Sequence, residues 1–358
     1  MYIEKLALND FRNYGSQEIT FSNGINIFYG DNAQGKTNIL EAIYMLATTK
    51  SHRGSRDKEI ISFGKDESHI RADISKKNIS HRIDMHLKKS KSKGVAIDML
   101  PIKKSADLFG LINIIFFSPE DLSIIKNGPA ERRRFMDMEL CQLNRIYYAN
   151  LANYNKVLNQ RNNLLKDDLY GKDSSLLDVW DIQLLDYGIK IIKERDNFIN
   201  MINEIIKDIH GHLTSGKENL KLIYEKNINE SAFAMELCNK RDIDIRYQTT
   251  QIGPHRDDIS FEINGVDVRK FGSQGQQRTV ALSLKLAEIE LVKKLINDNP
   301  ILLLDDVMSE LDSTRRDALL SSINDIQTII TCTGYDDFIK ERLSIDKIYK
   351  VVNGNLEV

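Results

Sequence analysis

The chain has 358 residues, of which 41% are hydrophobic and 28% charged, and its formal net charge is −2. This composition is typical of an ordinary globular protein, and the near-neutral charge excludes a strong attraction of the whole molecule to nucleic acid. The apolar runs break at charges or proline, no signal peptide is visible, and the three cysteines are widely spaced. These features predict a cytoplasmic protein without a membrane segment.

The first hundred residues are predicted to be rich in strands. Leu6 and Leu8 alternate with polar neighbours, and Asn23-Gly24 predicts a hairpin turn before the apolar strand INIFY. Two further alternating runs flank residues 88–94, which predicts a hairpin with a basic tip. DNA phosphates are the candidate ligands of its lysines, and a solvated tip is the alternative. These lysines are Lys88, Lys89, Lys91 and Lys93.

The character changes at about residue 131, where apolar residues begin to recur at helical spacing and continue to about residue 212. Sustained heptads are absent, which excludes a long coiled-coil arm. Strand and helix patterns alternate again from residue 244, with Asn-Gly hairpin turns at 264–265 and 353–354. The predicted domains are an ATPase lobe of residues 1–110 plus 245–358 and a mainly helical lobe of residues 111–244 inserted between its halves.

The segment GDNAQGKT at residues 30–37 fits the Walker A pattern G-x-x-x-x-G-K-[ST] at every position. It follows a predicted strand and opens a predicted helix, which is the context that a phosphate loop requires. The backbone at the loop glycines lets successive N–H groups face phosphate oxygens. We expect Lys36 to reach the β- and γ-phosphates and the Thr37 hydroxyl to ligate Mg²⁺. The predicted ATP contacts are Gly30, Asp31, Asn32, Ala33, Gln34, Gly35, Lys36, Thr37 and Asn38.

The segment ILLLDDV at residues 301–307 is typical of a buried central strand that ends in carboxylates, the Walker B pattern. Ligands of open α/β sheets bind at the carboxyl ends of the strands. We therefore expect Asp305 to hold Mg²⁺ and Asp306, together with Lys36, to be catalytic, with Asp306 orienting or deprotonating the attacking water. The strand pattern is weak alone and strong when paired with the Walker A loop.

A third segment, SQGQQ at residues 273–277, opens a long amphipathic helix. A serine hydroxyl and a glycine amide at a helix N-terminus make a second phosphate-binding surface. If both helices point outward, this surface cannot serve the phosphate of Lys36 within one chain, but it can serve the γ-phosphate held by a second subunit. The alternative is a plain helix cap by Ser273.

Residues 273–277 resemble the signature motif of the ABC-type ATPases, and SELD at 309–312 resembles their D-loop, with Ser309 and Asp312 as its polar residues. Within that group the chain is similar to the RecF family of DNA recombination and repair proteins, relatives of the Rad50 and SMC heads. The resemblance extends in order through nearly the whole chain, over residues 8–14, 30–38, 48–61, 117–137 and 253–259. It implies an α/β fold, an ABC-type P-loop ATPase head with central parallel strands and an inserted α-helical lobe.

The resemblance also implies a function. Two subunits would sandwich two ATP molecules, and the ATP-loaded homodimer would bind gapped DNA or single-strand/double-strand junctions with the RecO and RecR mediators, so that RecA is loaded in DNA repair, replication and the SOS response. Slow hydrolysis would release the clamp. Related heads place Arg12 and Asn13 against the nucleotide, and a simple strand-end turn is the alternative. The expected signature contacts in trans are Ser273, Gln274, Gly275 and Gln276.

The chain departs from the ABC pattern at three points. Walker B ends in Asp-Asp where most members have Asp-Glu, Gln142 is only a nominal Q-loop glutamine, and Thr331 or Thr333 stands where a switch histidine is expected. Three alternatives to the clamp remain open. The motor subunit of a membrane transporter would usually keep LSGGQ and the histidine, a nuclease-fused relative would need a further acidic domain, and a non-hydrolysing scaffold would leave Asp306 idle.

Several charged residues have two interpretations. Arg53 and Arg56 are candidates for nucleotide or DNA contacts or are plain surface arginines. The run from Arg132 to Arg134 is predicted to contact DNA or to pair with acidic neighbours. The charged cluster at residues 255–258 is predicted to form a structural network near the lobe junction.

Overall fold

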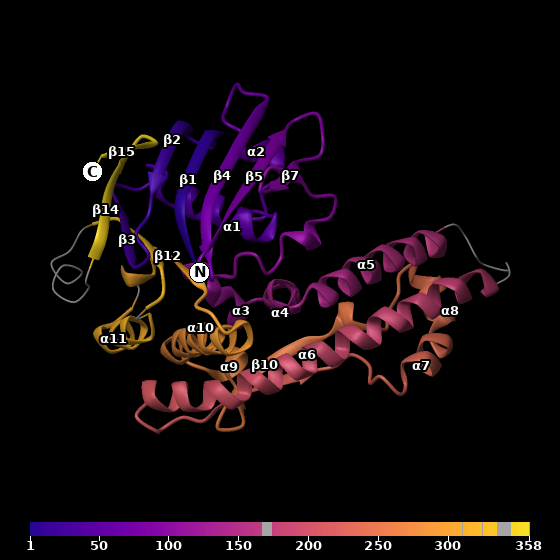
Figure 1. The fold of residues 1–358 in the computed structure, drawn as a ribbon. Helices are drawn as coiled ribbons and strands as arrows, with labels where there is room; N and C mark the ends of the chain where they lie inside the picture. The colour runs from indigo at the N-terminus through magenta and orange to yellow at the C-terminus, as the bar shows by residue number, and fades with distance from the viewer. Residues whose placement is uncertain (167–173, 310, 324, 335–344, 358) are drawn as a thin grey trace. The chain divides into compact units, whose positions relative to one another are not determined.

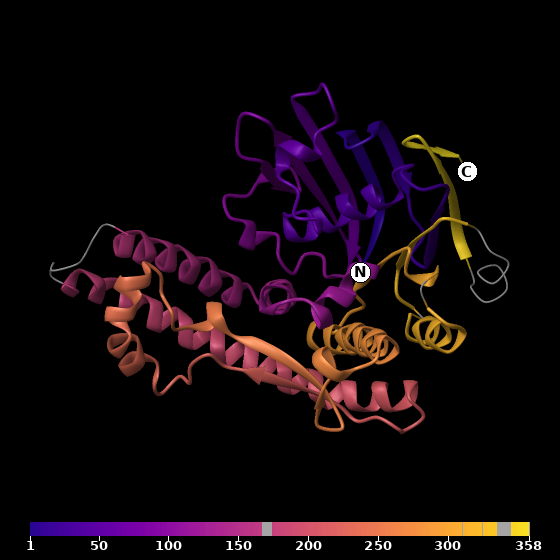
Figure 2. The same cartoon turned by 180° about the vertical axis from the view of Figure 1, so that it is seen from behind.

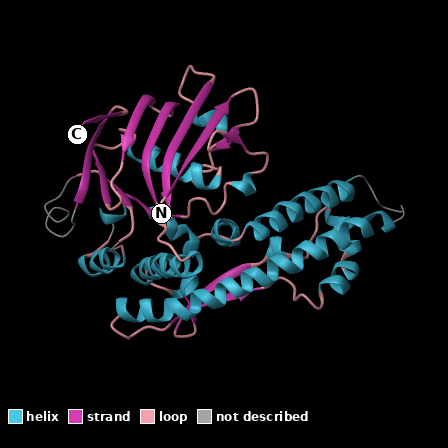
Figure 3. Ribbon diagram, in the orientation of Figure 1, coloured by secondary structure: helices cyan, strands magenta, loops and turns pink. Residues whose placement is uncertain are grey.

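The computed structural model describes residues 1–166, 174–309, 311–323, 325–334 and 345–357. The chain forms two compact units, residues 1–121 with 284–358 and residues 122–283. The first unit is rich in strands and the second in helices (Figure 3). This division differs from the predicted one at two places. Residues 111–121 lie in the first unit, where β8 (Ile114–Phe117) pairs with β12 (Ile301–Asp305). Residues 245–283 lie in the second unit, where strand β10 (Asp258–Ile263) pairs with β9 (Leu220–Glu225).

The first sheet of unit 1 has six antiparallel strands. One face is apolar, because Leu6, Leu8, Ile70, Ile83 and Met85 alternate with polar residues and are fully buried. The predicted hairpin around residues 88–94 is confirmed by the pairing of β5 with β6. In spatial order the strands are β2 (Tyr14–Thr20), β1 (Tyr2–Phe11), β4 (Glu67–Lys76), β5 (Ile79–Lys88), β6 (Gly94–Ile97) and β7 (Leu100–Pro101).

The second sheet of unit 1 carries the Walker B strand in a parallel core, with one antiparallel strand at its edge. This arrangement confirms the predicted mixed lobe with central parallel strands. Strand β12 is apolar along its length and buried up to its terminal aspartate. In spatial order the strands are β15 (Asn355–Glu357), β14 (Ile345–Val352), β3 (Ile25–Tyr29), β13 (Thr328–Cys332), β12 (Ile301–Asp305) and β8 (Ile114–Phe117).

Helix α1 (Lys36–Thr48) contacts strands of both sheets (Figures 1 and 2). Its buried residues include Ile39, Leu40 and Ile43. The predicted hairpin at Asn23-Gly24 is wrong, because β2 and β3 belong to different sheets. The remaining helical elements of unit 1 are α2 (Asp57–Ile60), α11 (Ser313–Ser322) and the 3-10 turns Ser105–Asp107, Pro119–Asp121 and Val307–Ser309.

Unit 2 is built on two long helices, α5 (Arg145–Lys166) and α6 (Asp178–Leu213), which pack along each other (Figure 1). A three-stranded sheet of β11 (Val266–Asp267), β10 and β9 accompanies them. No helix in the described part of the chain is both long and apolar enough to cross a membrane. The other helices are α3 (Leu122–Lys126), α4 (Pro129–Leu143), α7 (Phe233–Asn239), α8 (Arg241–Tyr247) and α9 (Val268–Phe271), and the 3-10 turns are Ser174–Leu177 and Pro254–Arg256. Helix α10 (Gln274–Ile296) begins in unit 2 and belongs to unit 1 from Leu284 on.

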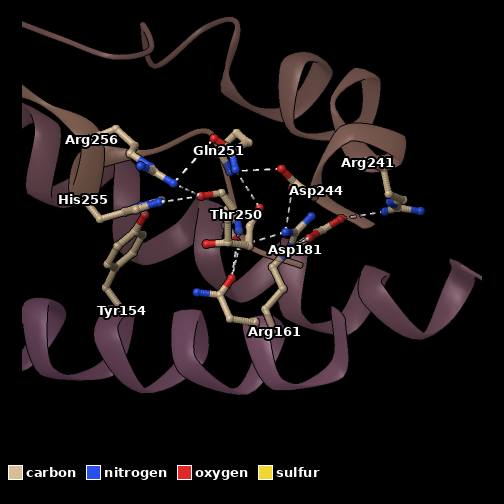
Figure 4. A network of polar contacts seen from close by, with 11 residues as sticks. Tyr154, Arg161, Asp181, Arg241, Asp244, Thr250, Gln251, His255 and Arg256 are labelled. Atoms are coloured by element: carbon tan, nitrogen blue, oxygen red, sulfur yellow. Dashed lines mark hydrogen bonds and ion pairs between the residues drawn. The ribbon is translucent and has the colours of Figure 1, made fainter. Parts of the chain in front are cut away.

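A buried ionic network ties α5 and α6 to the chain that follows α8 (Figure 4). The fully buried guanidinium of Arg161 donates to Asp181 at 2.6 Å, to Asp244 at 2.7 Å and to the hydroxyl of Thr250 at 2.8 Å. Nearby, His255 bonds the Tyr154 hydroxyl at 2.7 Å. These contacts satisfy polar groups that burial would otherwise leave without water.

The other predicted charges of this region also form internal pairs. Arg132 forms a bidentate pair with Asp258, at 2.6 and 2.9 Å, and Arg133 donates to the carbonyl of Asp257 at 2.7 Å. The carboxylate of Asp257 accepts from Arg195 at 3.1 Å and from the Tyr224 hydroxyl. The arrangement favours a structural role for these residues over DNA contact.

We predict that Arg161→Met lowers the free energy of unfolding by about 3–5 kcal/mol, because it leaves the buried Asp244 carboxylate without its cation. Lys190→Met is the matched control, since it breaks an exposed pair with Asp186 and should cost about 0.5 kcal/mol or less. Urea titration followed by helical circular dichroism measures both changes. Equal losses in the two variants would contradict the role of the network.

Candidate nucleotide-binding site

The Walker A segment forms a tight loop between β3 and α1. Gly30 and Gly35 have φ of 150° and 115°, and a side chain at Gly30 would overlap the carbonyl oxygen of Val351. Lys36 is 7% exposed, and its ammonium donates to the carbonyls of Gly30 at 2.6 Å and Asp31 at 2.7 Å. The lysine therefore folds back over its own loop, at the start of a helix whose N-terminal amides favour anions.

The Walker A and Walker B residues meet at the carboxyl edge of the parallel sheet. The Thr37 hydroxyl donates to Asp305 Oδ1 at 2.8 Å, and the Thr331 hydroxyl donates to the same oxygen at 2.6 Å. Thr331 lies opposite Asp305 because β12 and β13 pair in parallel register. The sequence placed Thr331 only where a switch histidine is missing. In the structure Thr331 contacts the Walker B carboxylate. No local sequence pattern indicates this contact.

Asp306 follows the strand with a left-handed backbone, φ 54°. Its N–H donates to the carbonyl and the hydroxyl of Thr331, both at 3.1 Å, so the backbone at this position is held in place. Ser309 lies close by and donates to the Asp306 carbonyl at 2.8 Å. Of the other D-loop residues, Asp312 caps α11 by accepting from the Arg315 N–H at 2.9 Å, and residue 310 lies outside the described part of the chain.

A pocket of about 580 Å³ adjoins the phosphate loop. Its lining includes Asn13 and Asn38, where Asn13 donates to the Gln34 carbonyl at 2.8 Å and Asn38 donates to Asn13 at 2.8 Å. Phe63, whose ring is fully exposed, also lines it. The lining is rich in cations and consists of Arg12, Asn13, Asn38, Arg53, Lys58, Glu59, Ile61, Ser62, Phe63, Gly64 and Lys89.

Arg12 lines this pocket, but its guanidinium is largely occupied by the protein. Its Nε and Nη2 donate to Glu41 at 2.8 and 2.6 Å, Nη2 also donates to Ser55 at 2.8 Å, and Nη1 donates to the Glu59 carbonyl at 3.0 Å. Burial opposes ionisation of Glu41, yet the hydrogen bonds from Arg12 and Ser51 hold its pKa below the usual value. The geometry therefore favours a structural role for Arg12, while Asn13 lies directly against the loop.

The signature segment lies in unit 2, at the start of α10. Ser273, Gln274 and Gly275 are exposed. The Ser273 hydroxyl accepts from the Gln276 N–H at 3.2 Å, and the Gln276 side chain accepts from the Ser273 N–H at 2.9 Å. This reciprocal capping box confirms a cap by Ser273 and accounts for Gln276 as well. Gln277 is buried and donates to the Val268 carbonyl at 3.1 Å.

The four lysines around the β5–β6 hairpin have uneven surroundings. Lys88 pairs with Glu67 at 2.8 Å and Lys89 with Asp66 at 3.6 Å. Lys93 donates to Asp57 at 2.9 Å and to the Thr49 carbonyl at the end of α1, so it has a structural function. Lys91 is exposed. DNA contact by these residues stays a prediction, and the basic character of the tip is partly neutralised.

Gln142, the nominal Q-loop residue, is buried within α4 of unit 2. In unit 1 the segment that follows β8 is Ser118 to Asp121, and Leu304 of Walker B lies opposite Phe117 of β8. The turn after β8 therefore reaches the same sheet edge as Asp305 without a glutamine. Sequence reasoning also missed Asn353 and Gly354, which contact Gln34. The sequence predicts their Asn-Gly turn, but it does not show that the turn lies against Gln34 of the phosphate loop.

Residues 2–356 match the family described as RecF/RecN/SMC N terminal domain. The fold is similar to the Smc head bound to the C-terminal winged-helix domain of ScpA, with a TM-score of 0.58 and 17% identity over 100% of this chain and 96% of that one. Fold and phosphate loop together define the class, an ABC-type P-loop ATPase head.

More similar proteins narrow this class. The chain is 60% identical over 359 residues to the DNA replication and repair protein RecF of Lachnospira eligens, covering 99% of each, and 46% identical over 361 residues to that of Clostridium botulinum, also covering 99% of each. The solved recombination mediator protein RecF-ATP in the RecFOR pathway gives a TM-score of 0.93 with 33% identity, over 99% of this chain and 97% of that one. The chain belongs to the RecF family of DNA replication and repair proteins. This membership favours the repair class over a transporter motor.

We predict that Arg12→Met lowers the free energy of unfolding by about 3–5 kcal/mol, because the Glu41 carboxylate, which is 0% exposed, loses its cation. Arg53→Met is the matched control from the same pocket, since its guanidinium makes one exposed bond, to Asn38 at 3.2 Å. Its stability should change by about 0.5 kcal/mol or less. Urea titration of both variants measures this, and an Arg12→Met protein as stable as Arg53→Met would refute the structural role.

Proposed function

We propose that the protein is an ATP-dependent DNA clamp of recombinational repair. The observation that carries the proposal is the phosphate loop facing an Asp305 carboxylate that two threonine hydroxyls hold in place. Membership of the RecF family supports the repair context. The phosphate loop and the exposed signature segment support ATP binding and dimerisation, and family membership supports DNA engagement.

The phosphate loop would hold the triphosphate of ATP. Lys36 and the amides at the start of α1 face anions, as in other P-loop proteins. The Thr37 hydroxyl and the Asp305 carboxylate are oxygen ligands whose atoms lie 2.8 Å apart, a donor set that suits Mg²⁺. Mg²⁺ bound there would neutralise charge on the β- and γ-phosphates.

Asp306 is the candidate residue for orienting the attacking water. Its backbone is fixed through both bonds to Thr331, so its carboxylate has a defined starting point. Aspartate is one methylene shorter than the glutamate of most ABC-type ATPases, which would place the carboxylate farther from the water. Hydrolysis would then be slow. DNA would stimulate it, and hydrolysis would be the step that releases the clamp.

The pocket beside the loop would receive the nucleoside. Its lining includes Asn38, one residue beyond Thr37, so it lies beside the position proposed for the phosphates. The fully exposed Phe63 ring in its lining offers a flat apolar face for a base. Arg53 and Lys58 add positive charge to the lining.

The signature segment would complete the site of a second subunit. The Ser273 hydroxyl accepts from the Gln276 N–H, and a hydroxyl that accepts one bond can still donate to a phosphate oxygen. Exposure of Ser273, Gln274 and Gly275 leaves this helix start open to a partner. Two subunits would then hold two ATP molecules between them, with Ser309 and Asp312 near the shared surface.

The clamp would close on gapped DNA or on single-strand/double-strand junctions. We place it in the cytoplasm, working with the RecO and RecR mediators and indirectly with RecA. The support for these partners is family membership, together with the solved relative described as a recombination mediator in the RecFOR pathway. The net charge of −2 means that DNA must meet a local basic surface.

We predict that the wild-type protein is monomeric alone and dimeric with Mg²⁺ and ATPγS, as measured by light scattering after size-exclusion chromatography. Lys36→Met should neither bind nucleotide nor dimerise. Ser273→Arg should bind nucleotide with wild-type affinity and stay monomeric, because the added side chain blocks the exposed helix start. Asn163→Arg, on an exposed position of α5, should behave as wild type. Normal dimerisation of Ser273→Arg would show that the segment does not act in trans.

We predict that ATP raises the affinity for gapped duplex DNA, and that Lys89→Ala/Lys91→Ala weakens it across all sequences. If both lysines meet phosphates, the slope of log affinity against log salt should fall by about 2. Fluorescence anisotropy at several salt concentrations measures this, with Lys207→Ala on an exposed position of α6 as the control. An unchanged slope would exclude the hairpin as a DNA contact, and no effect of ATP on affinity would count against the clamp itself.

A further inference from the structure

The turn between β14 and β15 touches the outer side of the phosphate loop. The Asn353 N–H donates to Gln34 Oε1 at 2.6 Å, and the Gly354 N–H donates to the Gln34 carbonyl at 3.1 Å. Asn13 Nδ2 donates to the same carbonyl at 2.8 Å. One loop carbonyl is therefore held by two donors from segments far apart in the sequence.

Holding this carbonyl determines the direction of a neighbouring amide. In a planar trans peptide the C=O and the following N–H point in opposite directions. With the Gln34 carbonyl turned toward Asn13 and Gly354, the Gly35 N–H points to the other side of the loop. The next peptide is held in the same way, because the buried Tyr14 hydroxyl donates to the Gly35 carbonyl at 3.1 Å. The Lys36 N–H is oriented accordingly.

Tyr14 can only act as a donor here if it stays protonated. Burial raises its pKa above the usual value, so the hydroxyl keeps its hydrogen at any physiological pH. The consecutive amides of Gly35 and Lys36 are thus aimed through carbonyls that have partners outside the loop.

The turn has the backbone that such a close approach requires. Asn353 and Gly354 have φ of 48° and 74°, as in the two-residue turns of tight hairpins. A side chain at Gly354 would overlap the carbonyl oxygen of Asn13. At the other end of the loop, a side chain at Gly30 would overlap the carbonyl oxygen of Val351 in β14. The hairpin therefore lies against the loop at both ends, and only glycine fits at the two points of contact.

We propose that the Asn353-Gly354 turn is a positioning element that aims the phosphate-binding amide of Gly35, beside the Lys36 amide whose peptide Tyr14 holds. The inference rests on the proposed binding of ATP by this loop. Gly354 touches no nucleotide in this account and acts only through Gln34 and Asn13. Loss of the contact lets the Gln34 peptide rotate, and the affinity for phosphates falls without any change in the loop sequence.

The test compares Gly354→Ala with Gly265→Ala. Gly265 is the matched control because Asn264-Gly265 is a second Asn-Gly turn, with φ of 52° and 81°, and its glycine has nothing within 4 Å of an added Cβ. Both variants bear a similar backbone strain. Gly354→Ala should weaken Mg-ATP and Mg-ADP by about tenfold or more in isothermal titration calorimetry, since the amides bind phosphates of both. Gly265→Ala should bind both as wild type does.

Hydrogen exchange without nucleotide supplies an independent readout. Peptides covering residues 30–36 should exchange faster than in the wild type in Gly354→Ala, and at the wild-type rate in Gly265→Ala. Asn353→Gly keeps the N–H and the positive φ, so it should retain wild-type affinity. If Gly354→Ala does not fold, Gln34→Ala takes its place and is measured by hydrogen exchange without nucleotide. It removes the Asn353 contact, so peptides covering residues 30–36 should exchange faster than in the wild type, and unchanged exchange would count against the positioning role.

The outcomes separate this inference from the proposed function. A wild-type protein that binds neither nucleotide would refute the proposed ATP site, while the exchange comparison would still report on the contact between hairpin and loop. Wild-type affinity and exchange in Gly354→Ala, or equal losses in Gly354→Ala and Gly265→Ala, would overturn the positioning role.

Discussion

The site depends on the direction of a few peptide groups. Each peptide carries a donor and an acceptor on opposite sides, so amides can face a phosphate only if their carbonyls find partners elsewhere. Here the Gln34 carbonyl accepts from the β1–β2 turn and from the β14–β15 turn, and the Gly35 carbonyl accepts from Tyr14. The Lys36 ammonium donates to the carbonyls of Gly30 and Asp31. The shape of an eight-residue motif is therefore a property of unit 1 as a whole.

Internal hydrogen bonds also hold the proposed metal ligand and the helix start in unit 2 in position. Asp305 is held by Thr37 and Thr331, and the parallel register of β12 and β13 brings the second threonine to it. Ser273 and Gln276 bond each other, so the signature helix has its cap in place before any partner arrives. Groups that are already in position need little reorganisation when a charged ligand binds. This saving is the source of the effect of electrostatic preorganisation.

Local patterns predicted what is local. The Walker A loop, the Walker B strand, the long helices and the Asn-Gly hairpins at residues 264–265 and 353–354 all follow from spacing within a short window. What failed or was missed depends on pairing between distant segments. Asn23-Gly24 connects two sheets rather than two paired strands, and Arg12 is occupied by Glu41, 29 residues away. Thr331 became part of the site through a neighbouring strand. Spacing within one segment carries no information on such partners.

The contact between Gln34 and Asn353 spans 319 residues of sequence. During synthesis the phosphate loop emerges early, but the turn that orients it is made only after the whole of unit 2. Contacts of such long separation form late because the intervening chain must first be ordered. A nascent chain that already contains the Walker A motif would therefore lack a loop able to hold nucleotide firmly. If ATP binds this loop as proposed, it would stabilise only molecules in which both distant parts have met.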